Sequence, residues 1–321
     1  MRILVTGGAG YIGSVVATRL LELGHTVTVL DDLSTGHADA VPPGATFVEG
    51  RVHDAAVALA GERFDGAVHL AASSLVAESI ANPEKYRLNN VVGTRLLLDT
   101  LLASGVPAIV FSSTAAVYGE PETVPIDEDA PTRPVNPYGE SKLAVDEMLA
   151  AEAATGRIGA VSLRYFNVAG AYAGRGERHD PETHLVPIAL QAALGTRAGL
   201  VVYGDDYPTP DGTCVRDYIH VADLAEAHLG ALASARPGAH RVFNLGNGAG
   251  FSVREVLAAV ERVTGVRLEV TVAGRRAGDP AVLVASAARA RRELGWTPAR
   301  PSLEQMIGDA WDVLRSGSDP R

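Results

Sequence analysis

A glycine-rich turn close to the N-terminus limits the folds open to this chain more than any other feature. The turn runs Gly7-Gly-Ala-Gly-Tyr-Ile-Gly13 between a predicted strand, Ile3–Thr6, and a predicted helix, Tyr11–Leu23. Glycines at this spacing permit a tight turn, a close approach of backbone to a pyrophosphate, and close packing of helix on strand. The helix that follows directs its free N–H groups at those phosphates. The turn predicts a dinucleotide-binding unit, whereas the motif alone would also fit an ordinary strand–helix turn.

Short apolar runs alternate with helical stretches over the first half of the chain. The predicted strands are Ile3–Thr6, Val27–Leu30, Thr46–Val48, Ala67–Leu70, Ala108–Phe111 and Val161–Leu163. The predicted helices between them are Tyr11–Leu23, a short one near Ala55–Ala60, Glu84–Ala103 and Tyr138–Thr155. Continuous aliphatic strands are typical of parallel sheets that are covered on both faces. The pattern predicts an α/β fold with a Rossmann-type, doubly wound parallel sheet.

The rhythm loosens beyond about residue 166, which predicts a second, smaller mixed α/β unit. Loops are expected at Gly170–Pro181 and Gly204–Gly212. The remaining predicted elements are helices at Val221–Ala235, Ser252–Val263, Ala287–Leu294 and Leu303–Leu314, and strands at Leu200–Tyr203 and Val242–Leu245. We expect residues 1–166, rejoined by about 217–246, to bind the dinucleotide. Residues 167–216 and 247–321 are expected to bind the substrate.

Composition excludes several classes of partner. Lysine and arginine total 28 against 38 aspartates and glutamates, so the net charge of −10 argues against nucleic acid and anionic membranes. The single cysteine, Cys214, permits no internal disulfide and fits a reducing compartment. No metal-ligand spacing surrounds it, and no metal is expected. The first apolar run is too short for a signal or membrane segment, which predicts a cytoplasmic protein.

Asp31 indicates which dinucleotide the turn would bind. It ends the second predicted strand, 18 residues after Gly13. A carboxylate at this place can accept a hydrogen bond from the adenosine ribose and would repel a 2′-phosphate, so NAD is favoured over NADP. A cap for the turn Asp31-Asp-Leu-Ser-Thr-Gly36 is the alternative role.

Tyr138 and Lys142 form the clearest candidate for proton transfer. Four residues apart, they share one face of the predicted helix. The lysine ammonium can favour the phenolate of a side chain whose ordinary pKa is near 10. Thr114 lies just after the predicted strand Ala108–Phe111, at the sheet edge where such folds place ligands. A base beside a dinucleotide site predicts oxidation of an alcohol.

With Thr114 upstream, this trio resembles the Ser/Thr–Tyr–Lys group of the extended short-chain dehydrogenase/reductase family. The second half of the chain sharpens the likeness. Five of its segments, in order, resemble the UDP-glucose (UDP-galactose) 4-epimerase family: Arg164-Tyr-Phe-Asn167, Thr183-His-Leu-Val-Pro187, Tyr203–Thr213, Val215-Arg-Asp-Tyr-Ile-His-Val221 and Arg275-Arg-Ala-Gly-Asp279. The resemblance runs from Met1 to about Trp311, and the combination is far more specific than any single segment.

The resemblance implies NAD as cofactor and a UDP-sugar as substrate. Tyr138 would be the acid/base, Lys142 its electrostatic partner and Thr114 the hydroxyl. The implied cofactor-binding residues are Gly7, Gly10, Tyr11, Ile12, Gly13, Asp31, Asp32, Val52, Leu70, Ala71, Ala72, Asn89, Tyr138, Lys142 and Phe166. The implied substrate-binding residues are Thr114, Tyr165, Asn167, His184, Leu185, Tyr203, Arg216, Arg276, Asp279 and Leu283. Guanidinium forks suit a diphosphate, although an arginine taken alone is more often a surface ion-pair partner.

Three positions depart from the family pattern. Arg51 replaces an aspartate that the family usually places near the adenine. Ser74 replaces a lysine that follows the fourth strand and adds a positive contact to the cofactor. Leu283 stands at the gate where small residues admit N-acetylated sugars and tyrosine excludes them; leucine is intermediate in size.

The expected reaction is the reversible C4 epimerisation of a UDP-hexose through a 4-keto sugar, with NAD retained. A nucleotide-sugar 4,6-dehydratase would need further acid/base groups after Thr114, where the chain has Ala115 and Ala116. Epimerases of UDP-N-acetylhexosamines, UDP-pentoses or UDP-uronic acids stay open, and a non-catalytic NAD-sensing protein is the alternative from another class. The family also implies a homodimer formed through helices near Glu84–Ala103 and Tyr138–Thr155.

Overall fold

The computed structural model describes residues 1–276 and 279–317. Ala277 and Gly278 of the Arg275–Asp279 motif, and the last four residues of the predicted second unit, lie outside the described residues.

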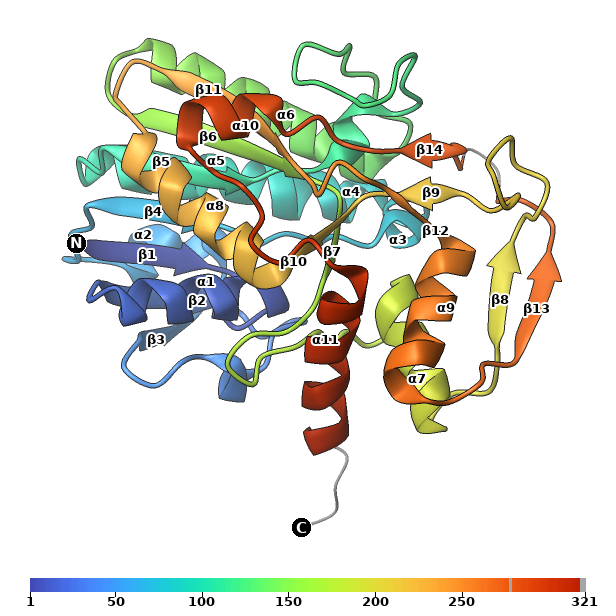
Figure 1. The fold of residues 1–321 in the computed structure, drawn as a ribbon. Coiled ribbons are helices and arrows are strands. Elements are labelled where there is room, and N and C mark those ends of the chain that lie inside the picture. The colour runs from blue at the N-terminus through green and yellow to red at the C-terminus, as the bar shows by residue number, and fades with distance from the viewer. Residues whose placement is uncertain (277–278, 318–321) are drawn as a thin grey trace.

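A seven-stranded parallel sheet forms the centre of the molecule (Figure 1). Its spatial order is β11-β6-β5-β4-β1-β2-β3, so the order reverses at β1. The strands are β1 (Arg2–Thr6), β2 (Thr26–Asp31), β3 (Thr46–Glu49), β4 (Gly66–His69), β5 (Ala108–Ser112), β6 (Gly159–Tyr165) and β11 (His240–Leu245). In open parallel sheets, ligands bind beyond the carboxyl ends of the strands near such a reversal. The glycine turn follows β1 and therefore lies at this place.

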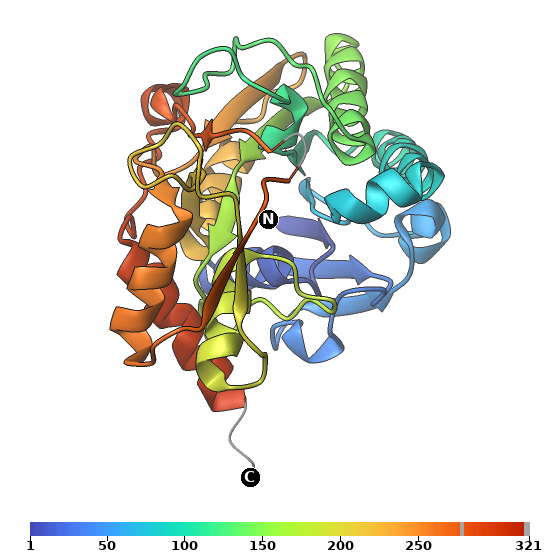
Figure 2. The ribbon, with the colours of Figure 1, turned by 90° about the vertical axis from the view of Figure 1, so that its right-hand side faces the viewer.

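Helices cover both faces of the sheet. One face packs on α1 (Tyr11–Glu22), α8 (Val221–Ser234) and α10 (Ala288–Leu294) through a core that includes Ile3, Leu20, Leu224 and Phe243. The other face packs on α2 (Ala55–Ala58), α5 (Gly93–Ala103) and α6 (Pro137–Ala154) through a core that includes Leu4, Leu97, Ile109 and Leu149. Viewed at right angles, α5 and α6 lie on the opposite side of the sheet from α8 (Figure 2). The predicted doubly wound α/β fold is confirmed.

A smaller mixed α/β part stands beside the carboxyl edge of the sheet (Figures 1 and 2). It contains α7 (Leu185–Leu194), α9 (Val253–Thr264) and α11 (Leu303–Gly317), which share a third core with Leu190, Val256 and Ile307. Its short strands are β7 (Asn167–Ala169), β8 (Leu200–Tyr203), β9 (Val215–Arg216), β10 (Tyr218–His220), β12 (Phe251–Ser252), β13 (Val270–Ala273) and β14 (Val282–Leu283). They pair as β10-β7, β13-β8 and β12-β9-β14.

Local sequence signals explain both ends of α9 and the start of α6. Ser252 and Glu255 form a reciprocal capping box at the start of α9, and Gly265 ends that helix in the left-handed conformation. Asn136 caps α6 by accepting from the Gly139 N–H, and Pro137 occupies the first helical position.

Several predicted elements differ from the observed ones. The single helix predicted over Glu84–Ala103 is α4 (Pro83–Tyr86), a π-helical stretch over Arg87–Val92, and α5. The structure adds α3 (Val76–Ala81) and α7, which the sequence did not indicate. Residues 287–296, assigned above to the second unit, pack instead against the first core through Ala287, Ala290 and Trp296. A further segment from the C-terminal part of the chain, residues 287–296, thus packs on the main sheet in addition to the expected 217–246.

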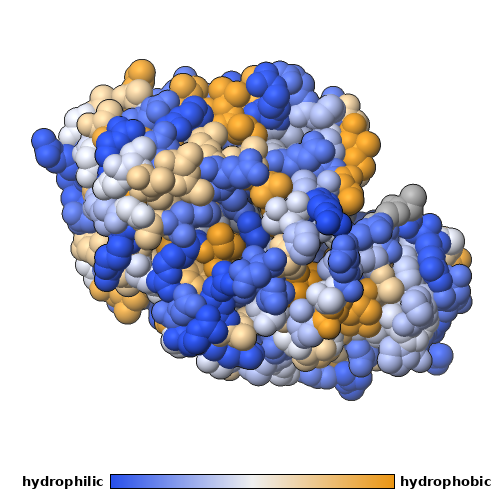
Figure 3. Space-filling model, turned by 90° about the horizontal axis from the view of Figure 1, so that it is seen from above, coloured by the Kyte–Doolittle hydropathy of each residue, from blue (hydrophilic) through white to orange (hydrophobic). Residues whose placement is uncertain are grey.

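Within residues 1–276 and 279–317, none of the helices combines the length and apolarity needed to cross a membrane. The surface seen from above is mainly hydrophilic, and its hydrophobic side chains form separate patches (Figure 3).

Candidate active site

The glycine turn is built so closely that side chains cannot replace two of its glycines, Gly7 and Gly13. Gly7 has φ of +72°, and a Cβ there would lie 2.6 Å from the backbone nitrogen of Ala71. A Cβ on Gly13 would lie 2.1 Å from the Gly7 carbonyl oxygen. Both separations are far below van der Waals contact. The turn, the start of α1 and the segment Leu70–Ala71 after β4 are therefore packed backbone to backbone.

The first turn of α1 is open for an anion. The helix begins at Tyr11 after Gly10, which supplies no side-chain cap, so its first N–H groups can bind a pyrophosphate. A cavity of about 430 Å³ is lined by Gly10 and Tyr11 and also by Arg175 and Arg178. This open helix end and the close-packed turn fit NAD, whose pyrophosphate the predicted residues Gly10, Tyr11, Ile12 and Gly13 would hold.

Asp31 lies at the end of β2, beside the turn. Its Oδ2 accepts from the Ala9 N–H at 3.0 Å, and its Oδ1 accepts from the Leu33 N–H at 2.9 Å. Burial raises the pKa of this carboxyl, while these two backbone hydrogen bonds lower it. The bond from Leu33 is that of the turn cap considered above, whereas the bond from Ala9 joins Asp31 to the glycine turn. Each carboxylate oxygen keeps a further lone pair for a ribose hydroxyl. Asp32 is exposed and accepts from the Ser34 N–H at 3.0 Å.

The structure brings Thr114, Tyr138 and Lys142 together at the carboxyl edge of the sheet. Thr114 follows β5, and Tyr138 lies in the first turn of α6. Burial raises the pKa of Tyr138, whereas its hydrogen bond with Thr114 lowers that pKa. The Tyr86 ring packs edge to face against the Tyr138 ring, with 6.4 Å between centroids. The Thr114 and Tyr138 hydroxyls are thus close enough to hydrogen-bond the same oxygen of a bound alcohol.

Lys142 lies one helical turn after Tyr138 and is buried. Its Nζ donates to the Ser112 carbonyl at 2.7 Å and stands 5.9 Å from the centre of the Tyr138 ring. Burial lowers the pKa of Lys142 to about 7, against the opposing effect of Asp146. The ammonium is thus held close to the Tyr138 ring by one hydrogen bond to the backbone.

A buried polar network that the sequence did not reveal supports this pair. Asp146 receives a 2.9 Å ion pair from Arg164 and accepts from the Ser113 hydroxyl at 3.2 Å. Arg164 also donates to the Tyr118 hydroxyl at 3.0 Å, and Tyr118 donates to Asn244 at 2.7 Å. The network joins α6, β6, β11 and the end of β5 around the turn Ala115–Tyr118 that follows Thr114, called the catalytic turn below. Asp146 stands four residues after Lys142, a spacing that could have drawn attention to it.

The other residues predicted to bind the cofactor differ in how far they are buried and in what they contact. Asn89 donates to the Ser73 hydroxyl at 3.2 Å, but its neighbour Asn90 is the buried amide, which bonds both Ser73 and Ser141. Val52 is half-buried at the start of a short turn after β3. Arg51 and Ser74, the two departures from the family pattern, are exposed.

Charged and aromatic residues predicted to hold the substrate meet on the smaller part. Arg216, at the end of β9, forms an ion pair with Asp279. The Arg276 guanidinium stacks over the Tyr203 ring, 4.0 Å from its centre. Asn167 donates through its side chain to the Asp217 carbonyl at 3.0 Å. These pairs offer two cations, a carboxylate and an aromatic face on the smaller part.

Leu283 connects this surface with the catalytic part. It pairs directly opposite Arg216 in the β14–β9 ladder. With Phe166, it packs against the buried residues Val117 and Tyr118 of the turn that follows Thr114. Tyr165 lies between the two parts; burial raises its pKa, and the neighbouring Tyr138 raises it further. The predicted gate residue is thus beside both the arginine and the catalytic turn.

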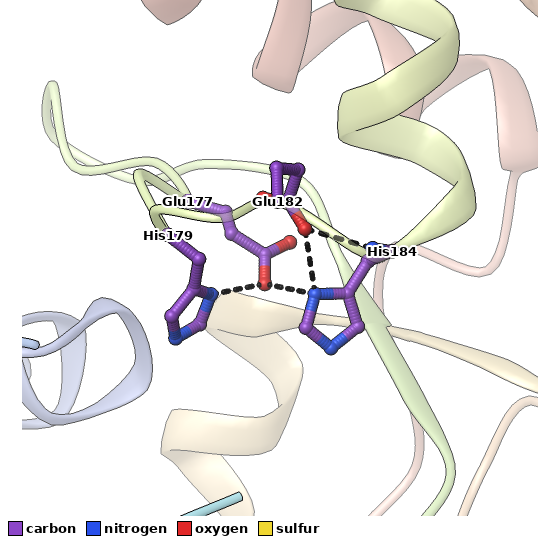
Figure 4. Close-up of side chains that lie close together, drawn as sticks. All are labelled: Glu177, His179, Glu182 and His184. Atoms are coloured by element: carbon purple, nitrogen blue, oxygen red, sulfur yellow. Dashed lines mark hydrogen bonds and ion pairs between the residues drawn. The ribbon is translucent and has the colours of Figure 1, made fainter. Parts of the chain in front are cut away.

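His184 and Leu185 belong to a separate group. His184 precedes α7, of which Leu185 is the first residue, and its ring contacts Glu177 and Glu182 (Figure 4). His179 completes the group, and the sequence had singled out only His184 among these four residues.

Comparison with known proteins adds independent findings. Residues 3–246 match the model of the NAD dependent epimerase/dehydratase family. The chain is 59% identical over 314 residues to UDP-glucose 4-epimerase of Streptomyces lividans, covering 96% of this chain and 94% of that protein. It superimposes with a TM-score of 0.92 on UDP-glucose 4-epimerase from Brucella ovis in complex with NAD, which is 44% identical, with 97% of each chain covered. The UDP-Glc/GlcNAc 4-epimerase of Campylobacter jejuni gives a TM-score of 0.86 at 43% identity, covering 98% of this chain and 99% of that one.

Proposed function

The chain belongs to the NAD dependent epimerase/dehydratase family, and we propose that it interconverts UDP-glucose and UDP-galactose by inverting the sugar C4. One observation carries the proposal: Thr114, Tyr138 and Lys142 converge at the carboxyl edge of the sheet, which also carries the NAD turn. The relatives named UDP-glucose 4-epimerase support the same substrate.

Tyr138 is the group that moves the proton. As phenolate it takes the proton from the sugar O4, and as phenol it returns that proton to the inverted alkoxide. Thr114 shares a hydrogen bond with Tyr138 and can bond the same sugar oxygen. NAD, held by the glycine turn, would supply the acceptor and the donor for the C4 hydride. General-base help of this kind contributes about 10²–10⁴-fold in rate.

Lys142 affects how readily Tyr138 loses its proton to become a phenolate. Burial raises the pKa of Tyr138, so the phenol is favoured until a positive charge is placed nearby. Lys142 is anchored to the Ser112 carbonyl, and its lowered pKa of about 7 lets it gain or lose its charge near neutral pH. In its charged form Lys142 favours the phenolate that takes the sugar proton.

The nucleotide must be held while the sugar turns. Arg216 and Arg276 offer guanidinium forks to a diphosphate, Asp279 offers a carboxylate to a ribose hydroxyl, and Tyr203 offers a stacking face to the base. These contacts are the same for both epimers. They anchor the substrate, so the 4-keto sugar can present its opposite face without leaving the site.

Dehydration is disfavoured by the residues after Thr114. A 4,6-dehydratase must also abstract a C5 proton and expel the C6 hydroxyl, which requires further acid/base groups. Ala115 and Ala116 occupy the turn after Thr114 and provide neither.

The test is an assay of the purified protein with UDP-glucose and with UDP-galactose. We expect each sugar to give the same final mixture, without accumulation of NADH. Steady release of NADH would indicate a dehydrogenase, and a product lacking one water would indicate a dehydratase. The same assay with the N-acetylated pair decides what the Leu283 gate admits.

A further inference from the structure

Four side chains from one short segment meet between the start of α1 and the start of α7 (Figure 4). Glu177 Oε1 contacts the Nδ1 atoms of His179 at 2.9 Å and His184 at 3.0 Å. Glu182 Oε1 lies 2.8 Å from the same His184 Nδ1, and it also accepts from the backbone N–H groups of Thr183 and His184. Both carboxylate side chains are almost fully buried, with exposed fractions of 8% and 3%.

Two buried carboxylates at one place require a positive partner. His184 is the residue that contacts both of them. Burial lowers the pKa of its imidazole, but the hydrogen bonds with Glu177 and Glu182 outweigh that effect and raise it to about 10. The other ionisable groups facing the cluster are His179 and Tyr11; burial raises the pKa of Tyr11, and the two glutamates raise it further. Tyr11 therefore stays neutral, and the positive charge resides on the His184 imidazole.

The contacts also fix the direction of the His184 ring. Because both neighbours of Nδ1 are carboxylate oxygens, Nδ1 must carry the proton and donate. The opposite nitrogen, Nε2, points away from the cluster, and 44% of the side chain is exposed. A ring held in this way presents a cationic N–H donor at the entrance to α7.

We propose that Glu177 and Glu182 are positioning residues that hold His184 as a cationic Nε2–H donor to the diphosphate of the substrate. This inference rests on the proposed function and on the family resemblance, which implies that His184 is a substrate-binding residue. A charge-assisted hydrogen bond to phosphate is about twice as strong as a neutral one, so removing the charge weakens nucleotide binding without touching the sugar C4. The glutamates thus act on binding through the histidine.

The test compares Glu182→Gln and Glu177→Gln with Asp180→Asn. The first two remove a charge from the cluster and retain an acceptor oxygen, whereas Asp180 is exposed in the same segment and contributes to none of the cluster contacts. We expect Glu182→Gln to raise the dissociation constant of UDP and the KM about tenfold while kcat changes less than twofold. Asp180→Asn should leave all three unchanged.

A double-mutant cycle identifies the route of the effect. In a His184→Asn background, Glu182→Gln should cause no further loss of UDP affinity, because the cation it supports is gone. An equal loss in both backgrounds, or an unchanged affinity in Glu182→Gln alone, overturns the proposal. Nitrogen-15 NMR of the His184 ring provides a structural readout: both ring nitrogens should be protonated at pH 8 in the unmutated protein, and a neutral ring would contradict the proposal.

Two further outcomes separate this proposal from its rivals. Two imidazoles and two carboxylates are also donors that zinc accepts, so one equivalent of zinc bound to the purified protein and lost from Glu182→Gln would replace the cationic histidine by a metal site. UDP affinity is measured without turnover. A protein that binds UDP through His184 and fails to epimerise would refute the proposed function and leave this inference standing.

Discussion

Tyr138 is the side chain on which the proposed chemistry depends. Its replacement by phenylalanine removes only the hydroxyl and keeps the ring that packs against Tyr86. We expect Tyr138→Phe to reduce the interconversion rate by at least about 10²–10⁴-fold, because the general base is lost. UDP affinity, measured by calorimetry, should be unchanged because Arg216 and Asp279 remain. An active Tyr138→Phe protein would refute the assignment.

Lys142 predicts a specific dependence of stability on pH. Burial lowers its pKa from an ordinary value of 10.5 to about 7. Between these values the unfolded chain binds more protons than the folded one, so this residue makes the free energy of unfolding rise with pH.

The measurement compares Lys142→Met with the unmutated protein by denaturant unfolding at several pH values from 7 to 10. Other groups contribute equally to both proteins and cancel. We expect the variant's stability relative to the unmutated protein to be greatest at pH 7 and to decline toward pH 10, by a total on the order of a few kcal/mol. A difference that is independent of pH would show that the lysine is not destabilised by burial.

The sequence allowed some of these residues to be predicted and left others hidden. Tyr138 and Lys142 were recognisable because they lie four residues apart on one helix. Asp146 lies on the same helix, but its partner Arg164 comes from β6 and its neighbour Ser113 follows β5. Such a network depends on the order of strands in the sheet, which no local spacing encodes. His184 was identified by resemblance alone, and its two glutamates were not identified at all.

At the scale of elements, the glycine turn provides a direct test of the cofactor site. A Cβ at Gly13 would lie 2.1 Å from the Gly7 carbonyl oxygen, so the turn and α1 must separate to admit it. We expect Gly13→Ala to lose most of the NAD that copurifies with the unmutated protein, measured by extraction and absorbance.

Gly230→Ala serves as the matched control. Gly230 lies within α8, and a Cβ there meets nothing within 4 Å. Its NAD content should equal that of the unmutated protein, and alanine should favour the helix. Equal NAD content in Gly13→Ala would mean that the cofactor does not depend on this turn.

The elements also show why prediction was better in one half of the chain. The parallel strands are apolar runs buried on both faces, and this pattern is visible locally. The strands β9, β12 and β14 have only two residues each, so their pairing is set by neighbours distant in sequence. The π-helical stretch at Arg87–Val92 keeps the apolar pattern of a helix and is likewise not distinguishable by periodicity.

At the scale of the whole molecule, exposed apolar side chains support the predicted homodimer. Ile80, Leu88 and Leu96 are exposed by 66%, 41% and 42%, and they lie on or next to the helices expected to form the intersubunit bundle. Burying them would remove apolar surface from water. We therefore expect a particle of twice the 33.4 kDa chain mass by light scattering.

A double substitution tests that surface. Leu88→Glu with Leu96→Glu should shift the particle toward 33.4 kDa, because two charges would be buried at the interface. The exposed Leu23→Glu, at the end of α1 and away from those helices, is the control and should stay dimeric. A monomeric unmutated protein would contradict the prediction.

The central claim is that one hydride leaves the sugar C4 and returns to it from a retained NAD. Deuterium at C4 follows that hydride directly. We expect UDP-glucose labelled with deuterium at C4, incubated with the purified protein in ordinary water, to give UDP-galactose that keeps the full label at C4. Loss of the deuterium to solvent would contradict the account, because it would mean that the carbon is inverted by proton exchange.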